Sequence, residues 1–371
     1  MKKNTLIMAV GLSASSAAIA TPFMNHGDGP DIFFVGADSV RYDDNVLQSE
    51  NGKINDTIFE ADPGLEFTSG KNAQLVSLLT YSEAITRYVD TSKLDTNLAR
   101  VNLTSSYDNK KTQVNLGAGF NQLNQNTPTS GVPGLLRRDA TNGNIKAETD
   151  LSPKTSVDLG FTYDKTEYKV AGLQDSKIYS VPVDVFYEYT PKLSLLAGFR
   201  YRRTDLQSLP DYQDYYYSVG ARGEFSAKLS GQFGVGLNQR RATGGNESSV
   251  GLNSNFLYAF SPKTTVNFGL SNDFGAASAG QSQKTFTVNG GVETLFSVDW
   301  KGNAALTYSK TEYVGTPART DNYYEGSLSA TYIINQNINV TASYTYRNNS
   351  SDAIGQSFKD NVLALTAAFR Y

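Results

Sequence analysis

Apolar and polar residues alternate with a period of two over most of the chain. Segments 156–164, 249–260 and 336–347 show the alternation, as does the C-terminal end. There, five apolar side chains fall on one face: Leu363, Leu365, Ala367, Phe369 and Tyr371. Successive side chains of a β-strand point to opposite faces, so this period predicts strands, and no helical period accompanies it. The pattern predicts an all-β protein.

Short turns separate the predicted strands. Residues 152–155 and 261–264 are both Ser-Pro-Lys-Thr, and residues 190–192 are Thr-Pro-Lys. Proline beside Ser or Thr is favourable turn chemistry. The residue before each short turn is usually large and apolar, and these residues recur at an almost constant interval: Phe67, Tyr107, Leu151, Tyr189, Phe225, Phe260, Phe296, Ile334 and Tyr371. The recurrence predicts nine hairpins, hence about 18 strands, with short turns alternating with longer loops.

Each predicted strand has one apolar face and spans about 10–15 residues, longer than the roughly 5–6 of soluble sheets. A bilayer contacts such faces directly, and every backbone group must then be paired within a closed sheet. An even strand count with short turns on one rim is typical of outer-membrane barrels. We therefore predict a transmembrane antiparallel barrel over residues 31–371, in contact with outer-membrane lipid and with both termini periplasmic. A large soluble β-protein is the disfavoured alternative.

The first twenty residues have the features of a secretory signal peptide. Lys2 and Lys3 precede an apolar or small stretch from Leu6 to Ala20, which ends in Ala18-Ile19-Ala20. This arrangement predicts cleavage after residue 20, and a single membrane anchor is the weaker alternative. Residues 21–30 are then a short periplasmic leader. Export of this kind places the protein in the cell outer membrane of a Gram-negative bacterium.

Composition excludes several kinds of chemistry. The net charge of −3 gives no basic surface for nucleic acid. There is no cysteine, and the single histidine, His26, precedes the first strand, so thiolate sites and a histidine-based triad are excluded. Asp43 and Asp44 could bind calcium but lack an ordered ligand spacing, and we expect a solvated loop. The sequence thus predicts no enzyme activity, no cofactor and no metal site.

With apolar faces outward, polar faces line a lumen, and barrels of 16–18 strands enclose an aqueous channel. Twelve charged residues are candidates for this lining: Glu60, Asp62, Glu66, Asp158, Asp184, Glu188, Arg200, Arg202, Arg222, Arg240, Arg347 and Arg370. Acidic and basic groups fall on different strands, which would allow a transverse field across the pore. Local cross-strand pairing that only stabilises the wall is the alternative.

Two further features bear on what the lumen could pass. Four tyrosines are candidates for stacking on sugar rings, or for an ordinary interfacial girdle: Tyr212, Tyr215, Tyr216 and Tyr217. The predicted loop 122–139 is the longest connection and could either fold into the lumen or lie on the surface.

At the other end of the chain, the terminal aromatic and its neighbours are typical of the signal read by the barrel-assembly machinery: Leu365, Ala367, Phe369 and Tyr371.

The predicted barrel has a distinctive opening made of two segments. The first is Arg41-Tyr42-Asp43-Asp44-Asn45-Val46, and the second is Asp56-Thr57-Ile58-Phe59-Glu60-Ala61-Asp62-Pro63-Gly64-Leu65. It resembles the outer-membrane β-barrel porins found in bacterial exopolysaccharide gene clusters. That resemblance implies passage of a secreted polysaccharide, with periplasmic polysaccharide-export proteins as partners. The leading expectation is therefore an exopolysaccharide export channel. A small-solute diffusion porin is the first alternative, and a surface structural or adhesion barrel with a closed lumen is the second.

Overall fold

The computed structural model describes residues 29–125, 130–243, 245–315 and 318–371. The predicted signal peptide, His26 and nearly all of the predicted leader lie outside these ranges. Within them, no helix is long and apolar enough to cross a membrane. The described elements are one short 3-10 helix, Ser92–Leu94, and the strands β1 Asp31–Asp43, β2 Asp56–Ala61, β3 Gly64–Ser69, β4 Leu75–Tyr88, β5 Thr96–Asp108, β6 Thr112–Gln125, β7 Leu136–Ser152, β8 Thr155–Tyr168, β9 Ser176–Thr190, β10 Leu193–Leu206, β11 Tyr212–Glu224, β12 Leu229–Ala242, β13 Gly245–Ser261, β14 Thr264–Ala276, β15 Ser282–Leu295, β16 Trp300–Val314, β17 Arg319–Ile333, β18 Ile338–Ser351 and β19 Phe358–Arg370.

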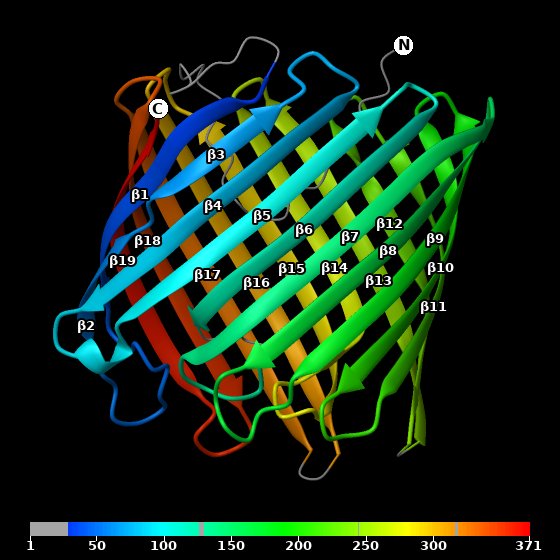
Figure 1. Ribbon diagram of the computed structural model, residues 1–371. Helices are drawn as coiled ribbons and strands as arrows, with labels where there is room; N and C mark the ends of the chain where they lie inside the picture. Colours follow the sequence, from blue (N-terminus) through cyan, green and yellow to red (C-terminus); the bar gives the residue numbers. More distant parts are fainter. Residues whose placement is uncertain (1–28, 126–129, 244, 316–317) are drawn as a thin grey trace.

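The strands form one closed antiparallel barrel (Figure 1). β19 pairs with β1 to close the ring, with Val35 opposite Arg370. β2 and β3 both lie between β1 and β4 in a single register. Pro63, which has no N–H to donate, falls between them and interrupts the ladder. They are therefore one strand position, and the predicted count of 18 positions in an all-β barrel is confirmed.

Short and long connections leave opposite rims, which we call the turn rim and the loop rim. The turn rim carries connections of two to five residues, from Gly70–Gln74 to Ile334–Asn337. The C-terminus lies at this rim (Figure 1). Loop-rim connections reach twelve residues between β1 and β2. The predicted alternation of short turns with longer loops does not hold throughout, because β12 and β13, which meet at the loop rim, are separated by only two residues.

The three Pro-Lys turns share one geometry. The register shifts by one residue just before each of them, beside Ser152, beside Thr190 and beside Ser261. The residue passed over is in each case the large apolar one: Leu151, Tyr189 and Phe260, with 60–67 % of its surface exposed. A bulge of this kind bends the strand end and re-aims one side chain. It places an apolar side chain on the outer surface at the turn rim.

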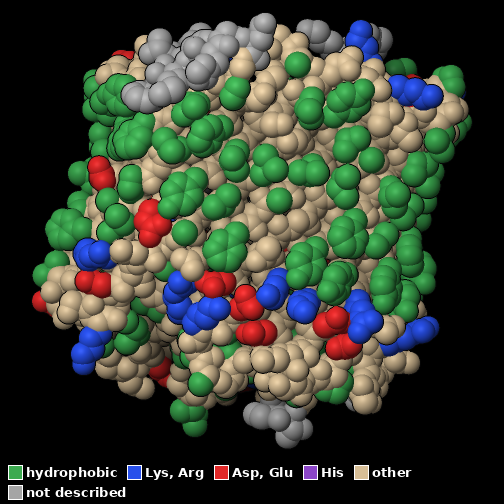
Figure 2. All heavy atoms as spheres, viewed as in Figure 1, with side chains coloured by type: hydrophobic (Ala, Val, Ile, Leu, Met, Phe, Trp, Pro, Cys, Tyr) green, Lys and Arg blue, Asp and Glu red, His purple; other side chains and the backbone are tan. Residues whose placement is uncertain are grey.

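The outer surface is apolar between the rims (Figure 2). Aromatic pairs link neighbouring strands there, including Tyr163–Tyr179, Tyr201–Tyr215 and Tyr308–Tyr324. Charged side chains gather in a band closer to the loop rim (Figure 2). This outer ion-pair belt contains Lys165–Glu167, Arg137–Asp139, Lys169–Asp139, Arg203–Asp205, Arg203–Asp211, Lys284–Glu312 and Lys310–Glu312. The belt marks where the apolar zone gives way to polar surroundings.

Candidate functional site: the lumen and its mouth

Two loop-rim connections from opposite walls meet across the mouth of the barrel. The backbone N–H and the hydroxyl of Ser278, between β14 and β15, both donate to the carbonyl oxygen of Ser130, between β6 and β7, at 2.9 and 2.6 Å. The two connections stand eight strand positions apart in the ring of 18, so they are almost diametrically opposite. Ser278 is 2 % exposed. The chain therefore crosses the mouth instead of surrounding it.

Further contacts fix the connection at residues 277–281, which we call the mouth loop. The Gln174 N–H, between β8 and β9, donates to the Ser278 carbonyl at 2.7 Å. The Tyr212 hydroxyl on β11 donates to the Gly280 carbonyl at 2.7 Å. Ala277 and Gly280 are buried. Because hydrogen bonds from three other parts of the wall hold the mouth loop, its position depends on the whole ring.

The connection between β6 and β7 folds inward, one of the two outcomes expected of loop 122–139. The Arg319 guanidinium on β17 donates to the Gly131 carbonyl at 3.0 Å and lies over the Tyr313 ring. Leu135, like Leu94, packs against an inner apolar cluster formed by Val46, Ile58 and Tyr88. Residues 126–129 lie outside the described ranges. The ends of the predicted loop belong to strands, since β6 runs to Gln125 and β7 starts at Leu136.

A network of charges lies beneath the mouth loop. Asp214 on β11 accepts from Arg202 at 2.7 Å and from Arg240 at 2.6 Å. Asp273 on β14 accepts from Arg202 at 3.0 Å and from Arg200 at 2.8 Å. Because β14 is four strand positions from β10, such a bond can form only on the inner side, where the wall curves toward itself. Arg240 and Asp214 are each 1 % exposed, so this pair is nearly closed to solvent, whereas Asp273 at the other end of the network is 31 % exposed.

A second network lies nearer the turn rim. The Arg222 guanidinium on β11 donates to Glu148 on β7 at 2.9 Å and stacks on the Phe186 ring. Lys146 pairs with the buried Asp158 at 2.6 Å. β7 and β11 are also four positions apart, so the Arg222–Glu148 contact bridges the inner wall, whereas Lys146 and Asp158 lie on the adjacent strands β7 and β8. The lumen is therefore braced near both rims on the side formed by β7 to β14.

Most of the remaining lining candidates pair with a charge on an adjacent strand or on the next strand but one. Glu66 pairs with Arg370 at 2.7 Å, and Arg347 pairs with Glu325 and Asp360 at 3.1 Å each. Other pairs are Glu60 with Arg41 and Asp62 with Arg100. Asp184 and Glu188 lie on β9. All six predicted arginines thus pair with a carboxylate, which favours the structural interpretation of these charges over an open transverse field. A direct role in permeation stays a prediction.

The four tyrosines do not form one surface, because β11 alternates. Tyr212 and Tyr216 point to the inner side, where Arg240 and Arg200 lie over their rings. Tyr215 packs on Tyr201 and Tyr217 packs on Phe199, on the outer side. A sugar chain in the lumen could therefore meet two of the four.

The C-terminal candidates Leu365, Ala367, Phe369 and Tyr371 share the outer face of the closing strand, where Phe369 stacks on Phe34. Their recognition by an assembly machinery stays a prediction.

Sequence reasoning missed several residues of the mouth and its network: Ser130, Glu148, Asp273, Ser278 and Arg319. Asp214 stood out beside the four tyrosines as a possible sugar contact, but the structure pairs it with Arg202 and Arg240. Ser278 carried no usable signal, because the segment Ala276-Ala277-Ser278-Ala279-Gly280 resembles any small-residue loop.

A family model described as "Putative beta-barrel porin 2" matches residues 37–371. No curated protein matches the chain. Similar solved structures include Pseudomonas aeruginosa OpdK with vanillate (TM-score 0.48, 11 % identity, 92 % of this chain and 99 % of that chain covered). Another is Acinetobacter baumannii OccAB4 (TM-score 0.48, 12 % identity, 92 % and 98 % covered). The chain therefore belongs to the putative beta-barrel porin 2 family, and is a porin-type barrel of the Gram-negative outer membrane.

Proposed function

We propose that this barrel is a selective diffusion channel for small polar solutes, the first alternative considered from the sequence. The observation that carries the proposal is the contact between Ser278 and Ser130 across the mouth. A backbone segment held between opposite walls divides the opening and restricts what enters. The inner wall beneath it is polar and charged, so it offers hydrogen bonds and fixed charges to a hydrated solute.

The test removes the crossing and measures permeation. Residues 277–281 are replaced by Asn-Gly, which suits a two-residue hairpin between the paired Ala276 and Ser282. The matched control shortens the exposed tip around Ile354, on the same rim, which does not cross the mouth. We expect higher single-channel conductance and faster liposome swelling with disaccharides from the mouth-loop variant only. Equal conductance in both variants would contradict a restricting role for the mouth loop.

Export of a secreted polysaccharide, with periplasmic export proteins as partners, is the second candidate. It is supported by the opening motif from Arg41 to Leu65, which resembles barrels of exopolysaccharide gene clusters. A deletion strain separates the two candidates. Slower uptake of small solutes with unchanged surface polymer supports the diffusion channel. Loss of surface polymer with unchanged small-solute uptake supports export, and the crossing at the mouth would then have to open for the polymer.

A further inference from the structure

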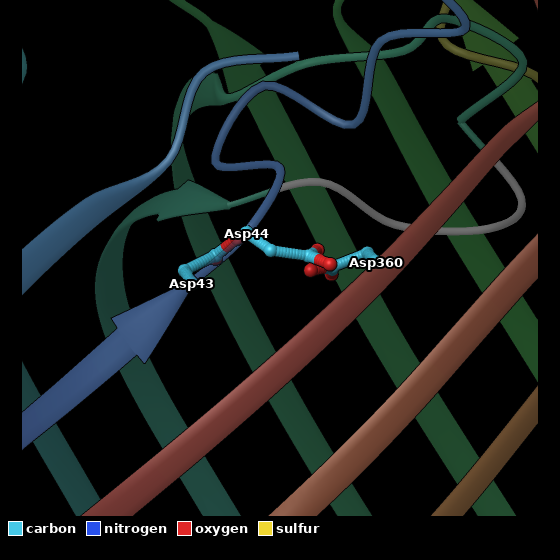
Figure 3. A group of neighbouring side chains, drawn as sticks. All are labelled: Asp43, Asp44 and Asp360. Carbon is cyan, nitrogen blue, oxygen red and sulfur yellow. The ribbon is translucent and has the colours of Figure 1, made fainter.

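Three carboxylates meet where the barrel closes, at the loop rim. Asp43 is the last residue of β1, Asp44 follows it, and Asp360 is the third residue of β19. One carboxylate oxygen from each lies within 4.8 Å of the others. Asp44 and Asp360 point toward one another (Figure 3). Residues more than 300 positions apart in the sequence thus bring like charges together at the seam between the first and last strands.

Asp360 is the member of this group that most requires a counter-charge. It is 0 % exposed. Its Oδ2 accepts from Arg347 at 3.1 Å and from Gln48 at 3.2 Å, but its Oδ1 is buried and has no hydrogen-bond donor. A buried carboxylate oxygen without a partner is costly. Arg347 is also shared with Glu325, so it cannot neutralise the group.

The other two carboxylates are held in place by hydrogen bonds that leave them able to bind a cation. Asp44 accepts from the backbone N–H and the side-chain amide of Asn361, at 2.8 and 2.6 Å. Asp43 accepts from the Asn45 N–H at 2.8 Å. Each carboxylate oxygen has a further lone pair. The arrangement presents carboxylate oxygens from three fixed side chains toward one point.

We propose that Asp43, Asp44 and Asp360 bind a calcium ion that fastens β1 to β19 at the loop rim. Hard carboxylate oxygens suit calcium, with Ca–O distances of about 2.3–2.6 Å. Two oxygens bound to one ion at about 2.4 Å are at most about 4.8 Å apart, the limit within which the three oxygens fall. Magnesium demands shorter, near-octahedral ligation, so calcium is the better fit. Water would complete the coordination.

The experiment measures calcium binding by the folded, full-length barrel in detergent, freed of lipopolysaccharide and treated with EDTA. Titration calorimetry with CaCl2 should show one saturable site, with a dissociation constant of roughly 0.1–1 mM, as in extracellular calcium modules. Asp360→Asn and Asp44→Asn should each weaken binding at least about tenfold. Asp352→Asn, an exposed loop carboxylate on the same rim, is the matched control and should bind as the wild type does.

A second measurement links the ion to the seam. Calcium, but not magnesium at equal concentration, should raise the midpoint of heat-induced unfolding of the wild type and of Asp352→Asn. Neither seam variant should respond, and their heat-modifiable gel mobility confirms that they are folded. No saturable wild-type binding below about 1 mM would overturn the proposal, as would unchanged binding in both seam variants. In the first case, greater stability of Asp360→Asn than of the wild type at neutral pH would show that the three carboxylates repel one another with no cation between them.

Discussion

The two rims of the barrel are built by different means. At the turn rim, the residue that opens a turn often accepts the backbone N–H two residues ahead, as Ser152, Thr190 and Ser261 do. At the loop rim, Ser130 and Ser278 bond across the mouth although they are 148 residues apart. Turn-rim geometry is therefore fixed by residues close together in the chain. The contact between the two loop-rim connections, in contrast, forms only when the ring has closed.

The seam shows the same contrast. At the turn rim, Phe34 and Tyr371 exchange two backbone hydrogen bonds, at 2.6 and 2.8 Å. At the loop rim, the Asp44 N–H still donates to the Asn361 carbonyl at 3.1 Å, but side-chain bonds are added, with the Asp44 carboxylate accepting from the Asn361 N–H and side-chain amide. Backbone bonds tolerate many side chains, whereas carboxylate and amide contacts need particular ones. The loop rim is thus more sensitive to single substitutions that leave the strands intact.

The largest effect is expected at the turn-rim seam. Deleting Tyr371 removes both bonds to Phe34 and the last aromatic of the closing strand, and we expect no heat-modifiable barrel in the outer membrane. The comparison variant is Asn361→Ala at the loop-rim seam, which should still assemble. Normal levels of folded barrel after deletion of Tyr371 would show that closure does not depend on this end of the seam.

The next effect concerns ion pairs at the two rims. Asp214→Leu leaves Arg240 buried without its carboxylate, and breaking a buried pair costs about 3–5 kcal/mol of unfolding free energy. Glu224→Leu at the turn rim breaks a pair with Lys192 whose members are 65 % and 56 % exposed, and exposed pairs contribute about 0–1 kcal/mol. Urea unfolding in detergent compares the unfolding free energies of the two variants. Equal losses of unfolding free energy would mean that solvent reaches Asp214 and its arginine partners.

A mutation at the mouth should change transport, and it should also lower stability because Arg319 pairs with the buried Asp321 at 2.9 Å. Arg319→Gln shortens the donor that reaches the Gly131 carbonyl. We expect a wider distribution of conductance levels in planar bilayers, because the connection between β6 and β7 loses one of its anchors. Lys263→Gln, in a turn at the opposite rim, should leave the conductance unchanged. If both variants conduct like the wild type, the crossing is held without the bond from Arg319.

The smallest effect is expected from single turns. Ser261→Ala removes one hydroxyl oxygen that accepts from Lys263 at 3.2 Å, and one such bond contributes about 0.5–1.5 kcal/mol. Ser152→Ala, in the turn with the same four residues, should cost the same amount. Unfolding midpoints of the two single variants and the double variant test this. A double loss far above the sum would show that the turns cooperate around the rim.

The sequence by itself determined the wall of the barrel. The period of two assigned each side chain to the inner or outer face, and the large apolar residues before the short turns marked hairpins at a nearly constant interval. These features are local, because a strand and its turn are fixed by neighbours in the chain. The closed ring of 18 positions followed from the even count and from the requirement that no edge be left open.

Only the tertiary structure decided what fills the lumen. The curvature of the wall brings Arg200 on β10 within reach of Asp273 on β14, and it brings Ser278 to Ser130. No pattern along the chain predicts either contact. The alternation that predicted the strands also separated Tyr215 from Tyr216, although they are adjacent in sequence. Asp43 and Asp360 become neighbours only because the first strand pairs with the last. A period along the chain assigns a face, whereas contacts across the lumen depend on the radius and stagger of the closed ring.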